Sequence, residues 1–136
     1  MKIDEQALIL KAYEAQKNAY APYSHFQVGA ALLGADGEIY QGCNIENAAY
    51  SPSNCAERTA FFKAVSEGKR EFLAIAIVGN EEGKAGDYCS PCGVCRQVMA
   101  EFCGGDFLVL MGKSKTEWKR RTLGELLPES FSLEKE

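Results

Sequence analysis

Apolar residues recur along this chain with two different periods, and together these predict helices that alternate with strands. Residues 4–20 and 55–67 carry apolar side chains at helical spacing, so each segment is expected to bury one face of a helix. A third helix is expected over residues 92–102, and a short helical turn over residues 123–127.

Residues with capping preferences mark the ends of these helices. Asp4 and Asn54 precede the first two helical segments and are expected to be their N-caps. Ser90 is the expected N-cap of the third helix, with Pro91 at its first helical position. Gly68 is expected to follow the C-cap of the second helix.

Strands are predicted between the helices. Residues 72–78 and 107–111 are continuous apolar runs, which are typical of strands buried on both faces. Residues 26–33 and 38–44 are expected to form a hairpin, because the Asp-Gly pair between them is a strong turn signal.

Further segments complete the predicted fold. Residues 115–121 read as a charged edge strand, and residues 79–88 as the longest irregular segment. Gly29, inside an apolar strand, indicates close approach of another backbone segment. We therefore expect one domain over residues 1–136, an α/β three-layer α/β/α sandwich with a mixed sheet of roughly five strands.

Composition narrows the classes of protein that the chain can represent. It has 136 residues, of which 46% are hydrophobic and 25% charged, as in ordinary folded proteins. The net charge of -4 argues against a nucleic-acid binder with a broad basic face, and residues 119–121 are read as a solvated edge strand. No stretch has the pattern of a secretory signal or a membrane span, so we expect a cytoplasmic protein.

The six cysteines suggest metal binding, because thiols in a reducing compartment are more often metal ligands than disulfides. Cys55, Cys92 and Cys95 offer three thiolates, which would leave the fourth position of a zinc ion open to water. Glu57 lies beside Cys55 and supplies the carboxylate that a hydrolytic site needs to move protons.

The expected positions of these cysteines make an anionic site plausible. Cys55, and the pair Cys92 and Cys95, fall in the first turns of two helices, whose positive ends would offset three sulfur charges. Arg58 and Arg96 each follow a motif residue, and either could donate to a ligand sulfur. Arg58 is favoured, while Arg96 is equally well read as a surface residue.

Other readings of the cysteines remain open at this point. The CxxC pair alone also fits a dithiol oxidoreductase, and the whole set fits a structural zinc knuckle or a zinc-stabilised interaction module. The other three cysteines, Cys43, Cys89 and Cys103, are expected to be buried small side chains. His25, the chain's single histidine, is expected to be a loop residue.

Longer segments add a resemblance to a known family. The sequence closely resembles the small, homotetrameric, zinc-dependent type of cytidine deaminase, a group that shares a cysteine or histidine, a nearby glutamate and a later PCxxC. The resemblance is carried by YAPYSHFQVGAAL (20–32), GCNIENAAYSPSNCAERTAFFKAVSEG (42–68), SPCGVCRQV (90–98) and ELLPESF (125–131).

The resemblance implies roles at the metal end of the site. Cys55, Cys92 and Cys95 match the ligands of one zinc ion per chain, and Glu57 matches the proton shuttle. The backbone of Ala56, together with Glu57, matches the groups that read the edge of the cytosine base.

The same resemblance implies substrate contacts. Asn44 and Glu46 match the pair that binds the ribose hydroxyls, and Phe26 matches an aromatic residue that packs on the base. Tyr50 and Phe131 match residues that complete a neighbouring subunit's site, so a homotetramer with composite active sites is implied.

The implied reaction is hydrolysis of cytidine or deoxycytidine to uridine or deoxyuridine and ammonia, a step of pyrimidine salvage. Water activated by zinc would attack C4 of the base, while Glu57 takes a proton, delivers it to N3 and helps ammonia leave. Glu46 is a poor partner for phosphate, which favours nucleosides over nucleotides. A zinc deaminase of nucleic acid or of a nucleoside antibiotic is the nearest alternative.

Overall fold

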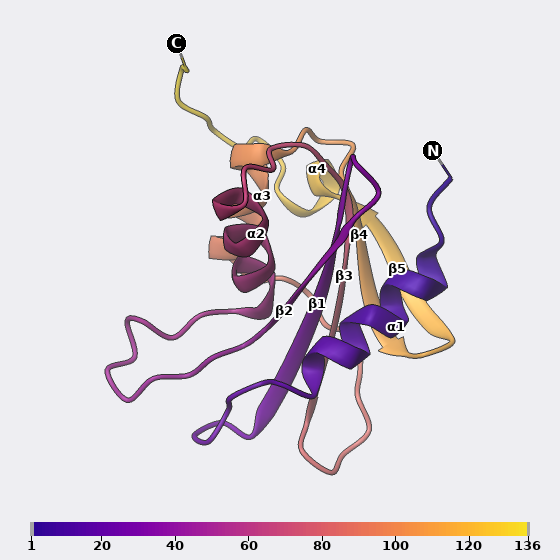
Figure 1. Ribbon diagram of the computed structural model, residues 1–136, viewed down its shortest axis with the longest axis vertical. Coiled ribbons are helices and arrows are strands. Elements are labelled where there is room, and N and C mark those ends of the chain that lie inside the picture. Colours follow the sequence, from indigo (N-terminus) through magenta and orange to yellow (C-terminus); the bar gives the residue numbers. More distant parts are fainter. Residues whose placement is uncertain (1, 136) are drawn as a thin grey trace.

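The computed structural model describes residues 2–135 and shows a five-stranded sheet covered by helices on both faces (Figure 1). The elements in chain order are α1 (Glu5–Gln16), β1 (Phe26–Gly34), β2 (Ile39–Cys43), α2 (Ala56–Ser66), β3 (Phe72–Glu81), α3 (Gly93–Phe102), β4 (Leu108–Ser114), β5 (Glu117–Thr122) and α4 (Leu123–Leu126).

The sheet has the strand order β2-β1-β3-β4-β5. Strands β3 and β4 are parallel, and the other neighbours are antiparallel. Helix α1 lies on one face, while α2 and α3 lie on the other (Figure 1). The predicted α/β sandwich with a mixed sheet is therefore confirmed, and the charged segment is an edge strand as expected.

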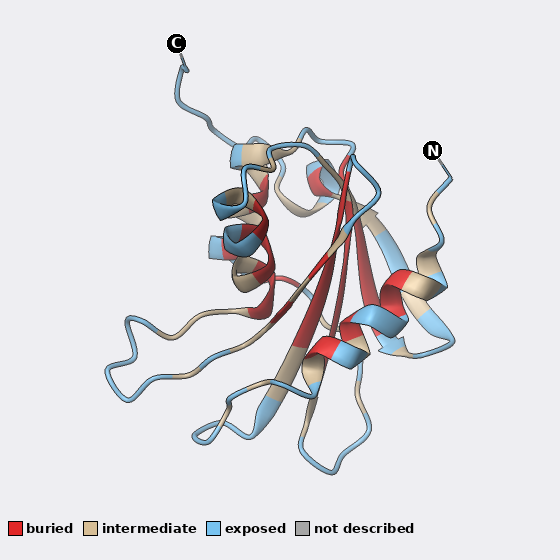
Figure 2. Ribbon diagram, viewed as in Figure 1, coloured by how far each residue is buried: buried red, intermediate tan, exposed pale blue. Residues whose placement is uncertain are grey.

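Successive side chains along each strand point to opposite faces of the sheet, so the core is divided into two clusters. In β1, Ala30 and Leu32 face α2, whereas Ala31 and Leu33 face α1. The central strands are buried over much of their length (Figure 2), which accounts for their nearly continuous apolar sequences.

Two glycines let helices approach the sheet closely. A Cβ atom at Gly29 would lie 2.0 Å from the carbonyl oxygen of Ala12 in α1. A Cβ atom at Gly42 would lie 2.4 Å from the carbonyl oxygen of Ala56 at the start of α2. The close approach predicted at Gly29 is confirmed, and Gly42 plays the same part on the opposite face.

Two predicted N-caps are wrong. Helix α2 is capped by Cys55 rather than Asn54, because the backbone of Asn54 pairs with Ile45 in an isolated bridge. Helix α3 is capped by Cys92 rather than Ser90, whose hydroxyl accepts a hydrogen bond from Arg96. In both cases the residue with the better capping propensity does not cap the helix, because it forms a hydrogen bond with another residue instead.

Helix α1 ends at Gln16 rather than near residue 20, but other boundaries lie closer to those expected from the sequence. Asp4 caps α1 by accepting from the N–H of Ala7 at 3.1 Å, and Gly68 follows the C-cap of α2 with a φ of 92°. Strand β3 continues beyond its apolar run to Glu81, because this extension pairs with the start of β1. The irregular segment predicted at 79–88 consequently begins later.

Among residues 2–135, no helix combines the length and apolar character needed to cross a membrane.

We expect Gly29→Ala to lower the free energy of unfolding by about 3 kcal/mol, because the new methyl group would meet backbone atoms of α1 that cannot move aside. Urea denaturation measures this loss. Gly105→Ala is the matched control, because its nearest neighbouring atom would lie 3.8 Å away, and its effect should stay within about 0.5 kcal/mol. Equal losses for the two variants would contradict the close packing of α1.

Candidate active site

Three cysteine sulfurs meet at one point of the structure. The Sγ atoms of Cys55, Cys92 and Cys95 all lie within 4.8 Å of one another, and those of Cys55 and Cys92 are 3.8 Å apart. Two thiolates on a tetrahedral zinc, each with a bond of about 2.3 Å, would be separated by about 3.8 Å. The cluster therefore fits one zinc ion with three protein ligands.

The start of two helices places these sulfurs. Cys55 is the N-cap of α2, Cys92 is the N-cap of α3, and Cys95 lies in the first turn of α3. The backbone N–H of Cys95 donates to the sulfur of Cys92 at 3.4 Å. Free N–H groups and the positive ends of both helices therefore face the cluster, where they stabilise thiolates.

Arg58 contributes a further positive charge. Its Nη2 donates to the sulfur of Cys55 at 3.3 Å, and its Nε is buried with no hydrogen-bond partner within the part of the chain that the structure describes. Hydrogen bonds from the Cys95 thiol and then from Arg58 lower the pKa of Cys55 to about 5, while the pKa of Cys95 is raised. Cys55 is thus more readily ionised than Cys95.

Arg96, the other candidate for a sulfur contact, is engaged elsewhere. Its guanidinium donates to the carbonyl oxygens of Pro91 and Leu126 at 2.8 and 2.7 Å and to the hydroxyl of Ser90 at 2.8 Å. Arg96 therefore connects the loop before α3 to the end of α4.

Glu57 is the only charged side chain that is buried among residues 2–135, with 4% of its surface exposed. Burial raises the pKa of Glu57 to about 7, and the negative charge of Cys55 adds to the effect. A cation at the cysteine cluster would favour the ionised form instead. The Glu57 carboxyl, buried beside the cluster, is thus positioned to exchange a proton with a group bound in the cleft.

A cleft of about 380 Å³ opens beside the cluster, large enough for a small organic ligand. It brings together most of the residues singled out in the sequence: Phe26, Asn44, Glu46, Cys55, Ala56, Glu57, Arg58 and Cys92.

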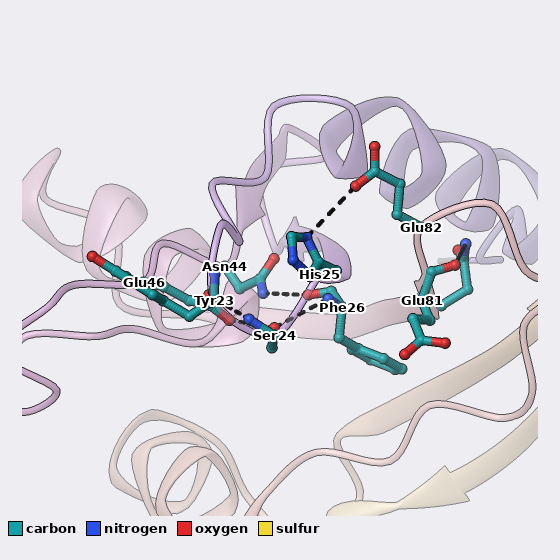
Figure 3. Close-up of polar contacts among 9 residues, drawn as sticks. Tyr23, Ser24, His25, Phe26, Asn44, Glu46, Glu81 and Glu82 are labelled. Atoms are coloured by element: carbon teal, nitrogen blue, oxygen red, sulfur yellow. Dashed lines mark hydrogen bonds and ion pairs between the residues drawn. The ribbon is translucent and has the colours of Figure 1, made fainter.

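Asn44 is hydrogen-bonded to the start of β1, and Glu46 to the turn that precedes it (Figure 3). The amide of Asn44 donates to the carbonyl oxygen of Phe26 at 2.8 Å and accepts from the N–H of Val28 at 2.9 Å. Glu46 accepts from the backbone N–H groups of Tyr23 and Ser24. The two polar side chains therefore have fixed positions on one wall of the cleft.

Tyr50 and Phe131 are not brought to this cleft within a single chain. Their side chains are 82% and 69% exposed, and neither lines the cavity.

Several residues of the cleft were not anticipated. Val28, Ser53, Asn54, Cys89 and Ser90 also line it. Only the expected loop before the third helix hinted at Ser90, and no local pattern indicated the others.

The remaining cysteines are half-buried rather than fully buried, which corrects the expectation for Cys43, Cys89 and Cys103. Burial still raises the pKa of Cys89 and of Cys103 to about 12, so both remain thiols. His25 lies in a loop as expected, with a φ of 59°.

Comparison with known proteins agrees with a zinc site at the cysteine cluster. Residues 2–111 match the family model described as the cytidine and deoxycytidylate deaminase zinc-binding region. The chain is 54% identical to a cytidine deaminase from Sporosarcina psychrophila, over 97% of this chain and 94% of that one. It is 51% identical to a cytidine deaminase from Halalkalibacterium halodurans, over 97% of both chains.

A solved structure shows the same fold. The crystal structure of a cytidine deaminase from Burkholderia pseudomallei superposes with a TM-score of 0.87 at 45% identity, covering 95% of this chain and all of that one. The cysteine cluster, the buried glutamate and the fold thus agree with the sequence match, and the chain belongs to the family of zinc-binding cytidine and deoxycytidylate deaminases.

Proposed function

We propose that this chain catalyses the zinc-dependent hydrolytic deamination of cytidine and deoxycytidine, giving uridine or deoxyuridine and ammonia for pyrimidine salvage. One observation carries the proposal: three cysteine sulfurs gather at two helix N-termini, and two of them, those of Cys55 and Cys92, line a cleft together with one buried carboxyl group. Similarity to curated cytidine deaminases supports the choice of substrate.

The cysteines and Glu57 divide the chemistry between them. Cys55, Cys92 and Cys95 would hold one zinc ion, which when bound makes a water molecule acidic enough to act as a nucleophile near neutral pH. Glu57 takes a proton from the attacking water, passes it to N3 of the base and later assists the departure of ammonia. Its buried position beside the cluster keeps this proton away from bulk solvent.

The opposite wall of the cleft would bind the nucleoside. Phe26 offers an aromatic face for the base, and the backbone of Ala56 lies next to Glu57 to read the base edge. The amide of Asn44 keeps one N–H and some acceptor capacity after its two bonds to β1, and Glu46 can accept from a ribose hydroxyl. Since Glu46 is an anion, the cleft favours uncharged nucleosides over nucleotides.

We infer that the working unit is a homotetramer in which each subunit contains this single domain. Tyr50 and Phe131 are strongly exposed in one chain, as expected of aromatic residues that complete a neighbour's site. The zinc site needs reduced thiols, and all six cysteines are free in the structure, which supports a cytoplasmic location.

Glu57→Gln should retain about one zinc ion per chain and lose cytidine turnover by about a thousandfold, because glutamine keeps the shape of the side chain but cannot carry the proton. An ultraviolet assay of cytidine loss, with metal analysis of the same sample, measures both quantities.

Glu67→Gln, at the exposed end of the same helix, is the matched control and should behave like the wild type. Substantial turnover by zinc-loaded Glu57→Gln would contradict the assigned proton transfer.

Phe131→Ala should reduce turnover by about tenfold or more, although the side chain is exposed in one chain. Coexpression of Phe131→Ala and Glu57→Gln chains should restore about a quarter of the wild-type activity, because random assembly pairs an intact Glu57 with a neighbour's intact Phe131 in about a quarter of the sites.

Leu133→Ala, in the same exposed tail, is the matched control and should retain full activity. Coexpressed chains that regain no activity would show that Phe131 acts within its own subunit, and sedimentation as a monomer would contradict the composite site.

A further inference from the structure

The carboxylate of Glu46 is held by the turn that precedes β1 (Figure 3). The backbone N–H groups of Tyr23 and Ser24 donate to Oε1 at 3.0 and 3.1 Å, and the Ser24 hydroxyl donates to Oε2. These hydrogen bonds lower the pKa of Glu46, with the Ser24 hydroxyl as the largest cause. The side chain therefore stays an anion with a fixed orientation.

The same hydroxyl also binds the neighbouring aromatic residue. The backbone N–H of Phe26 donates to Ser24 Oγ at 3.0 Å, so the hydroxyl donates to Glu46 and accepts from Phe26. The Asn44 amide donates to the carbonyl oxygen of the same residue, Phe26. Three residues of the cleft wall are thereby joined, and Ser24 is the connecting residue that does not itself line the cleft.

The hydrogen bonds to Glu46 leave little of its acceptor capacity free. A carboxylate has about four acceptor positions, of which the turn uses three. The remaining position can receive one hydroxyl of a ligand from a direction that the turn has already set. Without the Ser24 hydroxyl, Oε2 loses its partner and the flexible glutamate side chain regains rotational freedom.

We propose that Ser24 is a positioning residue that fixes the Glu46 carboxylate relative to Phe26 and so sets the preference of this cleft for substrates with ribose hydroxyls. The inference rests on the proposed function, in which Glu46 binds the ribose. Ser24 acts through Glu46 and does not touch the substrate.

Ser24→Ala should raise KM for cytidine about tenfold and change kcat by less than about twofold, because a hydrogen bond to a charged group is lost from the binding wall. KM for 2′,3′-dideoxycytidine should change by less than about twofold, since this nucleoside offers Glu46 no ring hydroxyl. Ser24→Thr keeps a hydroxyl and should restore the wild-type ratio of the two KM values.

Two further variants separate this role from a general effect on folding. Glu82→Gln alters an exposed side chain that faces His25 in the same region without touching Glu46, and both KM values should remain unchanged. In a Glu46→Gln background, adding Ser24→Ala should change KM for cytidine by less than about twofold, because the two residues act through one interaction.

The measurements distinguish a failure of the Ser24 inference from a failure of the proposed deaminase function. Equal changes for the two nucleosides in Ser24→Ala, or no change for either, would overturn the inference while leaving the deaminase function intact. Wild-type protein that deaminates neither nucleoside would overturn the proposed function and this inference with it.

Discussion

The convergence of two helix N-termini on three cysteine sulfurs is the constraint on which the rest of the site depends. Three thiolates in one place repel one another, and they persist only where positive charge and N–H donors surround them. Cys55 and Cys92 cap the two helices, and Arg58 supplies the remaining donor. The close approach of α2 to the sheet at Gly42 holds one of these helix ends in place.

The opposite wall of the cleft is held in place by hydrogen bonds to the backbone rather than by helix dipoles. Asn44 and Glu46 follow β2 and are tied by hydrogen bonds to the start of β1 and the turn before it. Charge at the metal end is thus organised by helix dipoles, whereas polar recognition at the other end is organised by backbone donors. The two ends meet because β1 and β2 are paired in the sheet that carries α2 on one face.

Sequence periodicity and charge were sufficient to predict the layered α/β fold and the edge strand. The identity and spacing of the cysteines were sufficient to predict the three metal-binding candidates. These patterns failed where a contact distant in sequence decided the outcome. Asn54 has a better capping propensity than Cys55, yet its backbone is used by Ile45. The extension of β3 is set by pairing with β1, and the link between Ser24 and Glu46 joins two loops. No local pattern encodes such contacts.

The central claim is that three thiolates of one chain form a zinc site with one open position. X-ray absorption spectroscopy of the purified, zinc-loaded protein tests it most directly. We expect about one zinc ion per chain with three sulfur neighbours at about 2.3 Å and one lighter oxygen or nitrogen neighbour. Four sulfur neighbours, or protein that binds no zinc, would contradict the account.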